Sequence, residues 1–128
     1  MKTLKTLTSW VEIPVSDMSR AKKFYETILD IQLQEMKFPN GLTMSFFPVE
    51  KTGVGGALCH LESHYKPSSN GVLLYITADP DIETVLEKVE KAGGKVVQTK
   101  KQISETAEHG FMALFIDCED NRIALYYI

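Results

Sequence analysis

The chain has 128 residues, of which 44% are hydrophobic and 24% charged, and its formal net charge is −3. This composition is typical of one soluble globular domain, and a mild negative charge without a basic cluster argues against nucleic acid as a partner. Because the sequence has no apolar run of membrane-spanning length and its start, MKTLKTLTSW, lacks an export signal, we expect a cytoplasmic protein without a membrane partner. Cys59 and Cys118 lack metal-finger spacing and are expected to be free thiols.

The stretch WVEIPVSDMSRAKKFYETIL predicts a strand, a capped turn and an amphipathic helix. Side chains alternate between the two faces of a strand, so one face should carry Trp10, Glu12 and Pro14 and the other Val11, Ile13 and Val15. Asp17 is the expected N-cap. The helix then presents one apolar stripe, formed by Ala21, Phe24, Tyr25, Ile28 and Leu29. A helix packed on the valine and isoleucine face leaves Glu12 on the opposite, inner face of the sheet.

Three more strands are predicted in the first half of the chain, over residues 31–38, 42–48 and 57–61. The turn between the first two contains Asn40-Gly41, a pair that accepts the positive φ of tight hairpins. The polar segment 62–71 is predicted to be a loop between two halves.

The second half repeats this order. A nearly continuous apolar strand over 71–78 precedes a helix, for which Asp79 is the expected N-cap and Pro80 the first residue. Gly93-Gly94 is the expected helix stop. The remaining predictions are strands over 95–99, 110–117 and 121–128, and a polar loop over 100–109.

Both halves therefore have the order strand, helix, strand, strand, strand. We predict a single domain over 1–128, with one module at about 8–61 and the second at about 71–128. Each module alone is too small to bury both faces of its sheet. The predicted fold is α+β, with two βαβββ modules forming a curved mixed sheet cup and the helices outside.

Three segments resemble the vicinal oxygen chelate superfamily, which includes glyoxalase I, extradiol dioxygenases and bleomycin- and fosfomycin-resistance proteins. They are VEIPVSDMSRAKKFYETIL, GGALCHLESHYKPSSNGVLLYITADPD and GFMALFIDCEDNRIAL. Within that superfamily the chain looks most like the small single-domain glyoxalase/bleomycin-resistance-like proteins. This resemblance implies a homodimer and a small-molecule ligand in the cup.

The chemistry that defines the superfamily uses a divalent metal held by inward-facing His and Glu residues. Carried over to this chain, the first ligand position is Trp10, its counterpart in the second half is Val72, and the last position is Ala124. The remaining position falls near Ala57, or at Cys59 after a slip of two residues. Divalent ions need several converging O or N donors. We therefore predict that this chain lacks the usual metal site and has no cofactor.

Glu12 is the main candidate for chemistry, as a general base or as an acceptor that anchors a ligand. The alternatives for Glu12 are a solvated carboxylate and a structural partner of Arg122. His60 is the second catalytic candidate because it lies in the fourth predicted strand. His64 and His109 are interpreted as solvated loop residues.

The remaining candidates are expected to bind substrate. Trp10 would form a stacking wall, and Val72 and Ala124 would form apolar lining. Tyr126 and Tyr127 lie on opposite faces of their strand, so one of the two should point into the cup, and Tyr126 is the candidate. The leading hypothesis is binding of a small organic molecule without the usual metal. The alternatives are a metal-dependent lyase, isomerase or dioxygenase with a non-standard divalent site, and a protein that sequesters a drug or toxin stoichiometrically.

Overall fold

The computed structural model describes residues 1–128, except the side chain of Ala107. The first half contains β1 (Trp10–Pro14), α1 (Met18–Leu29), β2 (Gln34–Lys37), β3 (Thr43–Phe46) and β4 (Gly55–His60). The second half contains β5 (Leu74–Thr77), α2 (Ile82–Val89), β6 (Lys95–Gln102), a short 3-10 helix (Ala107–His109), β7 (Phe111–Ile116) and β8 (Arg122–Tyr127). The predicted duplication of a βαβββ module is confirmed.

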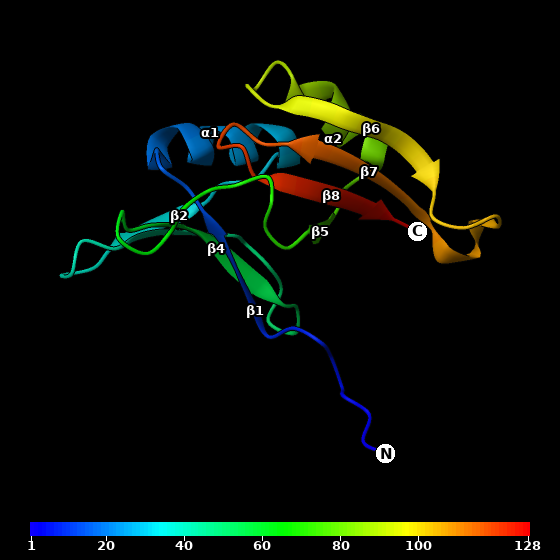
Figure 1. The fold of residues 1–128 in the computed structure, drawn as a ribbon, viewed down its shortest axis with the longest axis horizontal. Helices are drawn as coiled ribbons and strands as arrows, with labels where there is room; N and C mark the ends of the chain where they lie inside the picture. The colour runs from blue at the N-terminus through cyan, green and yellow to red at the C-terminus, as the bar shows by residue number, and fades with distance from the viewer.

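Each module forms one four-stranded mixed sheet, with the strand order β1-β4-β3-β2 in the first and β5-β8-β7-β6 in the second. In both sheets the first strand runs parallel to the last, and the other neighbours are antiparallel. β1 and β5 are therefore edge strands. Within the described residues the two sheets are not hydrogen-bonded into one closed sheet, so the cup stays open between these edges (Figure 1).

Helix α1 forms where the sequence predicts it. The Asp17 carboxylate accepts a 3.1 Å hydrogen bond from the backbone N–H of Arg20, which satisfies a free donor of the first turn. The helix ends at Asp30, whose φ of 55° lies in the left-handed region. Most of the predicted apolar stripe is buried, namely Ala21, Phe24, Tyr25 and Ile28. These residues pack with Ile13 and Leu58, so β1 turns Glu12 away from the helix, as expected.

Helix α2 begins later than expected, and the prediction of Asp79 as its N-cap is wrong. The cap is Asp81, whose carboxylate accepts a 2.8 Å hydrogen bond from the N–H of Thr84. Asp79 and Pro80 instead form the turn that leads into the helix, joined by a cis peptide bond. Both aspartates fit the preferences of a cap, but only Asp81 lies within reach of the first helical turn.

Several strand boundaries also differ from the prediction. β6 runs to Gln102 rather than ending at 99, because its pairing with β7 continues to the pair Gln102 and Phe111. β2 covers only Gln34–Lys37, and β5 begins at Leu74. Asp120 has a φ of 68°, so the turn between the last two strands contains a residue in the left-handed region.

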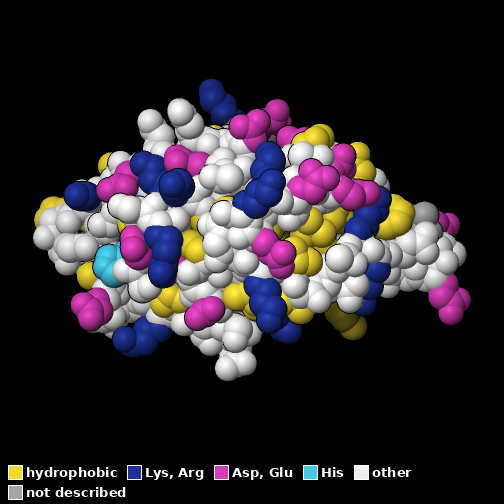
Figure 2. Space-filling model, turned by 90° about the horizontal axis from the view of Figure 1, so that it is seen from above, with side chains coloured by type: hydrophobic (Ala, Val, Ile, Leu, Met, Phe, Trp, Pro, Cys, Tyr) yellow, Lys and Arg dark blue, Asp and Glu magenta, His cyan; other side chains and the backbone are white. Residues whose placement is uncertain are grey.

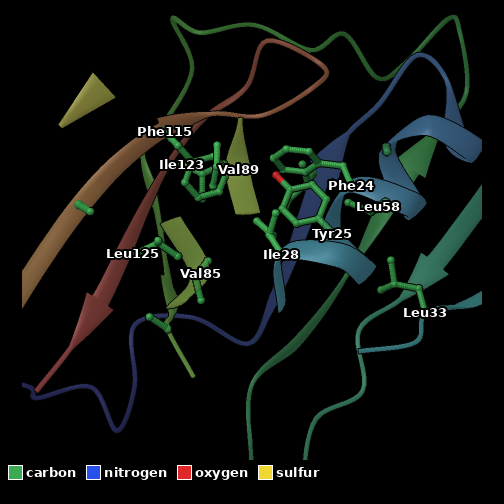
Figure 3. Packing of buried hydrophobic residues seen from close by; sticks show 14 of the residues in the cluster. Phe24, Tyr25, Ile28, Leu33, Leu58, Val85, Val89, Phe115, Ile123 and Leu125 are labelled. Carbon is green, nitrogen blue, oxygen red and sulfur yellow. The ribbon is translucent and has the colours of Figure 1, made fainter. Parts of the chain in front are cut away.

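One apolar core connects the two modules. Phe24 of α1 lies against Phe115 of β7, with ring centroids 6.0 Å apart, and the two helices pack against each other (Figure 3). On the outer surface, acidic and basic side chains are interspersed (Figure 2). Among the described residues, neither helix is long and apolar enough to cross a membrane.

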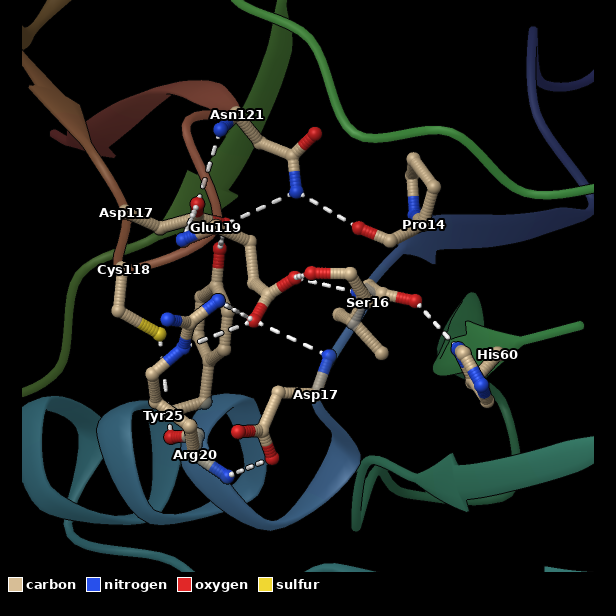
Figure 4. A network of polar contacts seen from close by, with 11 residues as sticks. Pro14, Ser16, Asp17, Arg20, Tyr25, His60, Asp117, Cys118, Glu119 and Asn121 are labelled. Carbon is tan, nitrogen blue, oxygen red and sulfur yellow. Dashed lines mark hydrogen bonds and ion pairs between the residues drawn. The ribbon is translucent and has the colours of Figure 1, made fainter. Parts of the chain in front are cut away.

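A buried polar network also joins the modules, and we call it the inter-module network. The phenol of Tyr25 donates a 2.6 Å hydrogen bond to Asp117, and the amide nitrogen of Asn121 donates to Asp117 at 3.1 Å and to the carbonyl of Pro14 at 2.8 Å (Figure 4). Burial raises the pKa of Asp117, and the hydrogen bonds from Tyr25 and Asn121 act in the opposite direction. These contacts fix the start of β8 beside the end of β1.

Glu119 provides the second part of the inter-module network. Its side chain is fully buried and accepts hydrogen bonds from the backbone and hydroxyl of Ser16 and from the Nε and a terminal nitrogen of Arg20, the last at 2.6 Å. Burial acts to raise the pKa of Glu119, but the bonds from Ser16 and Arg20 outweigh it, so the pKa lies below its usual value. Both apolar and charged contacts therefore fix the two modules relative to each other.

Candidate ligand-binding cleft

A cleft of about 1070 Å³ lies between the edge strands β1 and β5. Its size suits a small organic molecule. Its floor consists of apolar side chains that belong to the core or pack against it, namely Val11, Ile13, Leu29, Ile31, Phe47, Leu74, Ile76 and Ile123. Its walls carry side chains from the inner faces of the sheets, and four charged residues line it: Glu12, Lys66, Asp79 and Arg122.

Trp10 and Glu12 form the wall contributed by β1. Both project from the inner face of the sheet, as the alternation predicts, and the Trp10 side chain is 47% exposed. The indole ring of Trp10 lies 6.0 Å from the ring of Phe46, measured between centroids. This contact with β3 supports the indole, and Trp10 also lines the cleft.

The Glu12 carboxylate is held by two donors. The phenol of Tyr65 donates a 2.6 Å hydrogen bond to Oε1, and the indole N–H of Trp10 donates to Oε2 at 3.2 Å. A carboxylate has about four lone-pair positions, so both oxygens can still accept a bond from a ligand. The prediction of a structural pair between Glu12 and Arg122 is not met, since the partners of Glu12 are these two aromatic residues.

The Glu12 carboxylate contributes to raised pKa values of two neighbouring groups, the Tyr65 phenol and the Cys59 thiol. The hydrogen bond to Glu12 is the main cause that raises the pKa of the Tyr65 phenol, so the phenol stays protonated and keeps donating. Burial, followed by the charge of Glu12, raises the pKa of the Cys59 thiol to about 11. A protonated thiol is a poor nucleophile, which favours a packing role for Cys59 at this site.

Tyr75 forms the opposite wall, and the sequence did not single it out. The register places Glu12 beside Ala57 in the first sheet and Tyr75 beside Ala124 in the second, so Tyr75 is the structural counterpart of Glu12. Its side chain is 48% exposed and lines the cleft. Alignment of the strand sequences VEIPV and LYITA would have found this equivalence.

The register also revises the expected counterpart of Trp10. If Glu12 corresponds to Tyr75, then Trp10 corresponds to Leu73 rather than to Val72. Val72 precedes β5, and its side chain is 97% exposed at the rim of the cleft. The prediction was off by one residue because the apolar run does not mark where the strand starts.

The other predicted residues lie away from this cleft. Ala124 is fully buried within the second sheet. Tyr126 lines a smaller cavity of about 410 Å³ with Thr77 and Asp79 near the chain end. His60 follows the helix-facing Leu58 by two residues, and its Nδ1 lies 2.9 Å from the carbonyl of Val15. The structure therefore brings Trp10 and Glu12 together but places His60 on the opposite face of the sheet.

The donors at the family's ligand positions do not fit a divalent metal ion. Ala57 and Ala124 offer only methyl groups, Val72 and the revised counterpart Leu73 offer only alkyl groups, and the indole N–H of Trp10 donates to Glu12. Within the part of the chain that the structure describes, His, Cys, Asp and Glu form no group of three or more that could hold a metal. Glu12 is thus a single oxygen ligand without a convergent set.

Solved structures with a similar fold are numerous. A glyoxalase/bleomycin resistance protein from Albidiferax ferrireducens has 18% identity and a TM-score of 0.73, and the alignment covers 96% of this chain and 100% of that one. Glyoxalase I from Zea mays has 21% identity and a TM-score of 0.70, with 92% of this chain covering 44% of the maize protein. The chain thus spans less than half the length of the maize enzyme.

A third similar structure is an antibiotic-binding protein from a Streptomyces species, with 20% identity, a TM-score of 0.63 and 98% coverage of both chains. At these identities the likeness establishes the fold.

No curated protein sequence matches the chain. The family model of the Glyoxalase/Bleomycin resistance protein/Dioxygenase superfamily matches residues 8–124, which is nearly the whole sequence. The chain belongs to the glyoxalase/bleomycin resistance protein/dioxygenase superfamily.

Proposed function

We propose that this protein binds a small organic molecule with a planar aromatic part in the cleft between β1 and β5. The observation that carries the proposal is the pair of half-exposed aromatic side chains, Trp10 on β1 and Tyr75 on β5, which line one cleft together with the Glu12 carboxylate, two residues after Trp10. A ligand that covers a half-exposed aromatic side chain in a cleft with an apolar floor removes apolar surface from water, which favours binding.

The apolar contacts would supply most of the affinity. Covering an aromatic ring in such a site contributes roughly 1.5 to 3 kcal/mol. Trp10 is already oriented by Phe46 and by its bond to Glu12, so little side-chain freedom is lost when a ligand stacks on it. This preorganisation favours a binding site over an accidental surface hollow.

Glu12 would supply the polar anchor. Its carboxylate is fixed by Tyr65 and Trp10 and retains free acceptor capacity. A ligand ammonium or hydroxyl group can therefore donate to it, and a bond from a cationic donor is the stronger of the two. We propose binding rather than turnover as the activity, because His60 faces away from the cleft and the pKa of Cys59 is raised. The antibiotic-binding protein of similar fold supports this choice.

A fluorescence titration tests the proposal, because Trp10 is the only tryptophan of the chain. We suggest 4-nitrobenzylamine as the probe, since it combines a quenching aromatic ring with a cationic donor. We expect saturable quenching of Trp10, and a Tyr75→Ala variant should weaken the binding by roughly tenfold. A Tyr127→Ala variant serves as the matched control, because Tyr127 is an exposed tyrosine that does not line this cleft. Linear quenching equal to that of free N-acetyltryptophanamide would refute the proposal.

The independence from a metal ion is also part of the proposal. The protein should be incubated separately with nickel, zinc, iron and manganese, desalted and subjected to elemental analysis. We expect no stoichiometric retention, and probe affinity should be unchanged by a chelator. Retention of one ion per chain that is lost in Glu12→Gln would overturn this part and favour a metal-dependent enzyme with a non-standard site.

A further inference from the structure

We infer that the cleft selects amphoteric ligands, in which a positive group and a negative group stand at opposite ends of a rigid planar body. The inference rests on the proposed function and adds the charge pattern of the ligand to it. It follows from the positions of the four charged residues along the cleft: Glu12, Lys66, Asp79 and Arg122.

The basic residues gather at one end. The amide of Asn121 donates to the carbonyl of Pro14 at 2.8 Å, so Arg122, the next residue, starts β8 beside the last residue of β1. The N–H of Ser68 donates to the side-chain oxygen of the same asparagine at 3.2 Å, which brings the segment containing Lys66 to that end as well. Arg122 lines the cleft at this end, and Lys66 also lines the cleft, with its ammonium group donating to the carbonyl of Glu62 at 3.4 Å.

The acidic residues lie farther along. Glu12 precedes Pro14 by two residues, which is about 7 Å along a strand. On the other wall, β5 runs parallel to β8 from the pair Leu74 and Ile123, so Arg122 lies at the start of β5, whereas Asp79 follows its end. The cleft is therefore basic near the junction of the modules and acidic from its middle to its far end.

Arg122 is available to a ligand. The ion pairs formed by the described residues are Arg20 with Glu119, Lys22 with Glu35 and Lys100 with Glu83, and they include neither Arg122 nor Lys66. The Arg122 side chain is exposed. Its planar guanidinium matches a carboxylate through two parallel hydrogen bonds. A ligand carboxylate would therefore bind at this end while an ammonium group approaches Glu12.

Four probes with one aromatic core separate the charge pattern from aromatic binding. They are 6-(aminomethyl)-2-naphthoic acid, which is amphoteric, 2-naphthylmethylamine, which is cationic, 2-naphthoic acid, which is anionic, and 2-naphthylmethanol, which is neutral. Isothermal titration calorimetry at low salt should rank the amphoteric probe first, roughly fivefold tighter than the cationic probe. This advantage should shrink as salt is raised, because exposed charges are screened.

Variants assign the effect to Arg122. Arg122→Gln should remove the advantage of the amphoteric probe over the cationic one and leave the cationic probe unchanged or slightly tighter. Lys23→Gln is the matched control, since Lys23 is an exposed cation on α1 outside the cleft, and it should preserve the ranking. If the neutral, cationic and amphoteric probes bind equally, the charge inference is wrong while the proposed function stands. If none of the four binds, both fail.

Discussion

The phenol of Tyr65 donates a 2.6 Å hydrogen bond to the Glu12 carboxylate across 53 positions of sequence. Tyr65 lies in the segment between the two modules, and Glu12 lies in the first strand. The bond ties this connecting segment to the inner face of the first sheet. Together with the indole N–H of Trp10, which donates to the other oxygen, it fixes the orientation of the Glu12 carboxylate.

The hydrogen bond predicts the titration of Tyr65. Since the protonated phenol donates to the Glu12 carboxylate, the pKa of Tyr65 is raised, and Glu12→Gln should bring it back toward the ordinary value for tyrosine. The measurement is an ultraviolet titration in which the curve of a Tyr65→Phe variant is subtracted, once with Glu12 and once with Gln. Identical difference curves in the two backgrounds would show that the bond is absent in solution.

The buried Glu119 predicts a large loss of stability. Glu119→Gln removes the charge that pairs with Arg20 and leaves fewer acceptors for Ser16, so the free energy of unfolding should fall by about 2 to 3 kcal/mol. Urea denaturation measures this change. Glu105→Gln alters an exposed glutamate and should change stability by less than about 0.5 kcal/mol.

The same comparison has a predicted pH dependence. The pKa of Glu119 is lower in the folded state than its usual value of 4.5. Its ionised form therefore stabilises the fold fully above the unfolded-state pKa, and this contribution is lost as the pH falls through the folded-state pKa. The stability difference between the parent chain and Glu119→Gln should be constant between neutral pH and about pH 5.5 and shrink below about pH 4.5. A difference that grows on acidification would contradict this account.

Gly94 marks a close approach that admits no side chain. A Cβ at this position would lie 2.8 Å from the Cε1 of Phe24 and 2.6 Å from the carbonyl oxygen of Ile116. Gly94→Ala should therefore reduce the free energy of unfolding by about 2 to 3 kcal/mol, the usual range for overpacking. Gly71→Ala is the control, since a Cβ there meets nothing within 4 Å. Equal stabilities of the two variants would refute the described packing of α1.

The thiols should be unreactive in the folded protein. Burial raises the pKa of Cys59 to about 11 and that of Cys118 to about 12. At pH 8 only about one Cys59 in a thousand would be a thiolate, and the alkylation rate follows that fraction. Mass spectrometry after iodoacetamide treatment at pH 8 should find both thiols unmodified when the unfolded chain is fully labelled. Rapid native labelling of Cys59 would contradict its buried position.

Much of the fold could be predicted because its strands and helices follow from the local periodicity of apolar residues in the sequence. The alternation along WVEIPV and the stripe of α1 each depend on neighbours in sequence, and the two modules repeat the same order. Strand ends were less predictable, since β6 continues to Gln102 only because β7 lies beside it. The cap of α2 was misplaced because Asp79 and Asp81 have the same chemistry.

The cleft was predicted in part. The place of Trp10 and Glu12 on the inner face of the sheet follows from the alternation of side chains along β1 alone. Tyr75 required the exact register between the modules, and Tyr65 lies in a polar segment whose path no periodicity defines. The charge of Arg122 is visible in the sequence, but its place at one end of the cleft depends on the contact between Asn121 and Pro14. Side chains positioned by long-range contacts are thus the part that sequence patterns miss.

The central claim is that a ligand stacks on Trp10 while donating to Glu12. The most direct measurement is the indole N–H resonance of Trp10 in a ¹⁵N-labelled sample titrated with 4-nitrobenzylamine, because one tryptophan gives one such signal. We predict a large, saturable shift of this resonance, since the indole N–H already bonds the carboxylate that the ligand approaches. A resonance that stays in place while the probe reaches millimolar concentration would contradict the account.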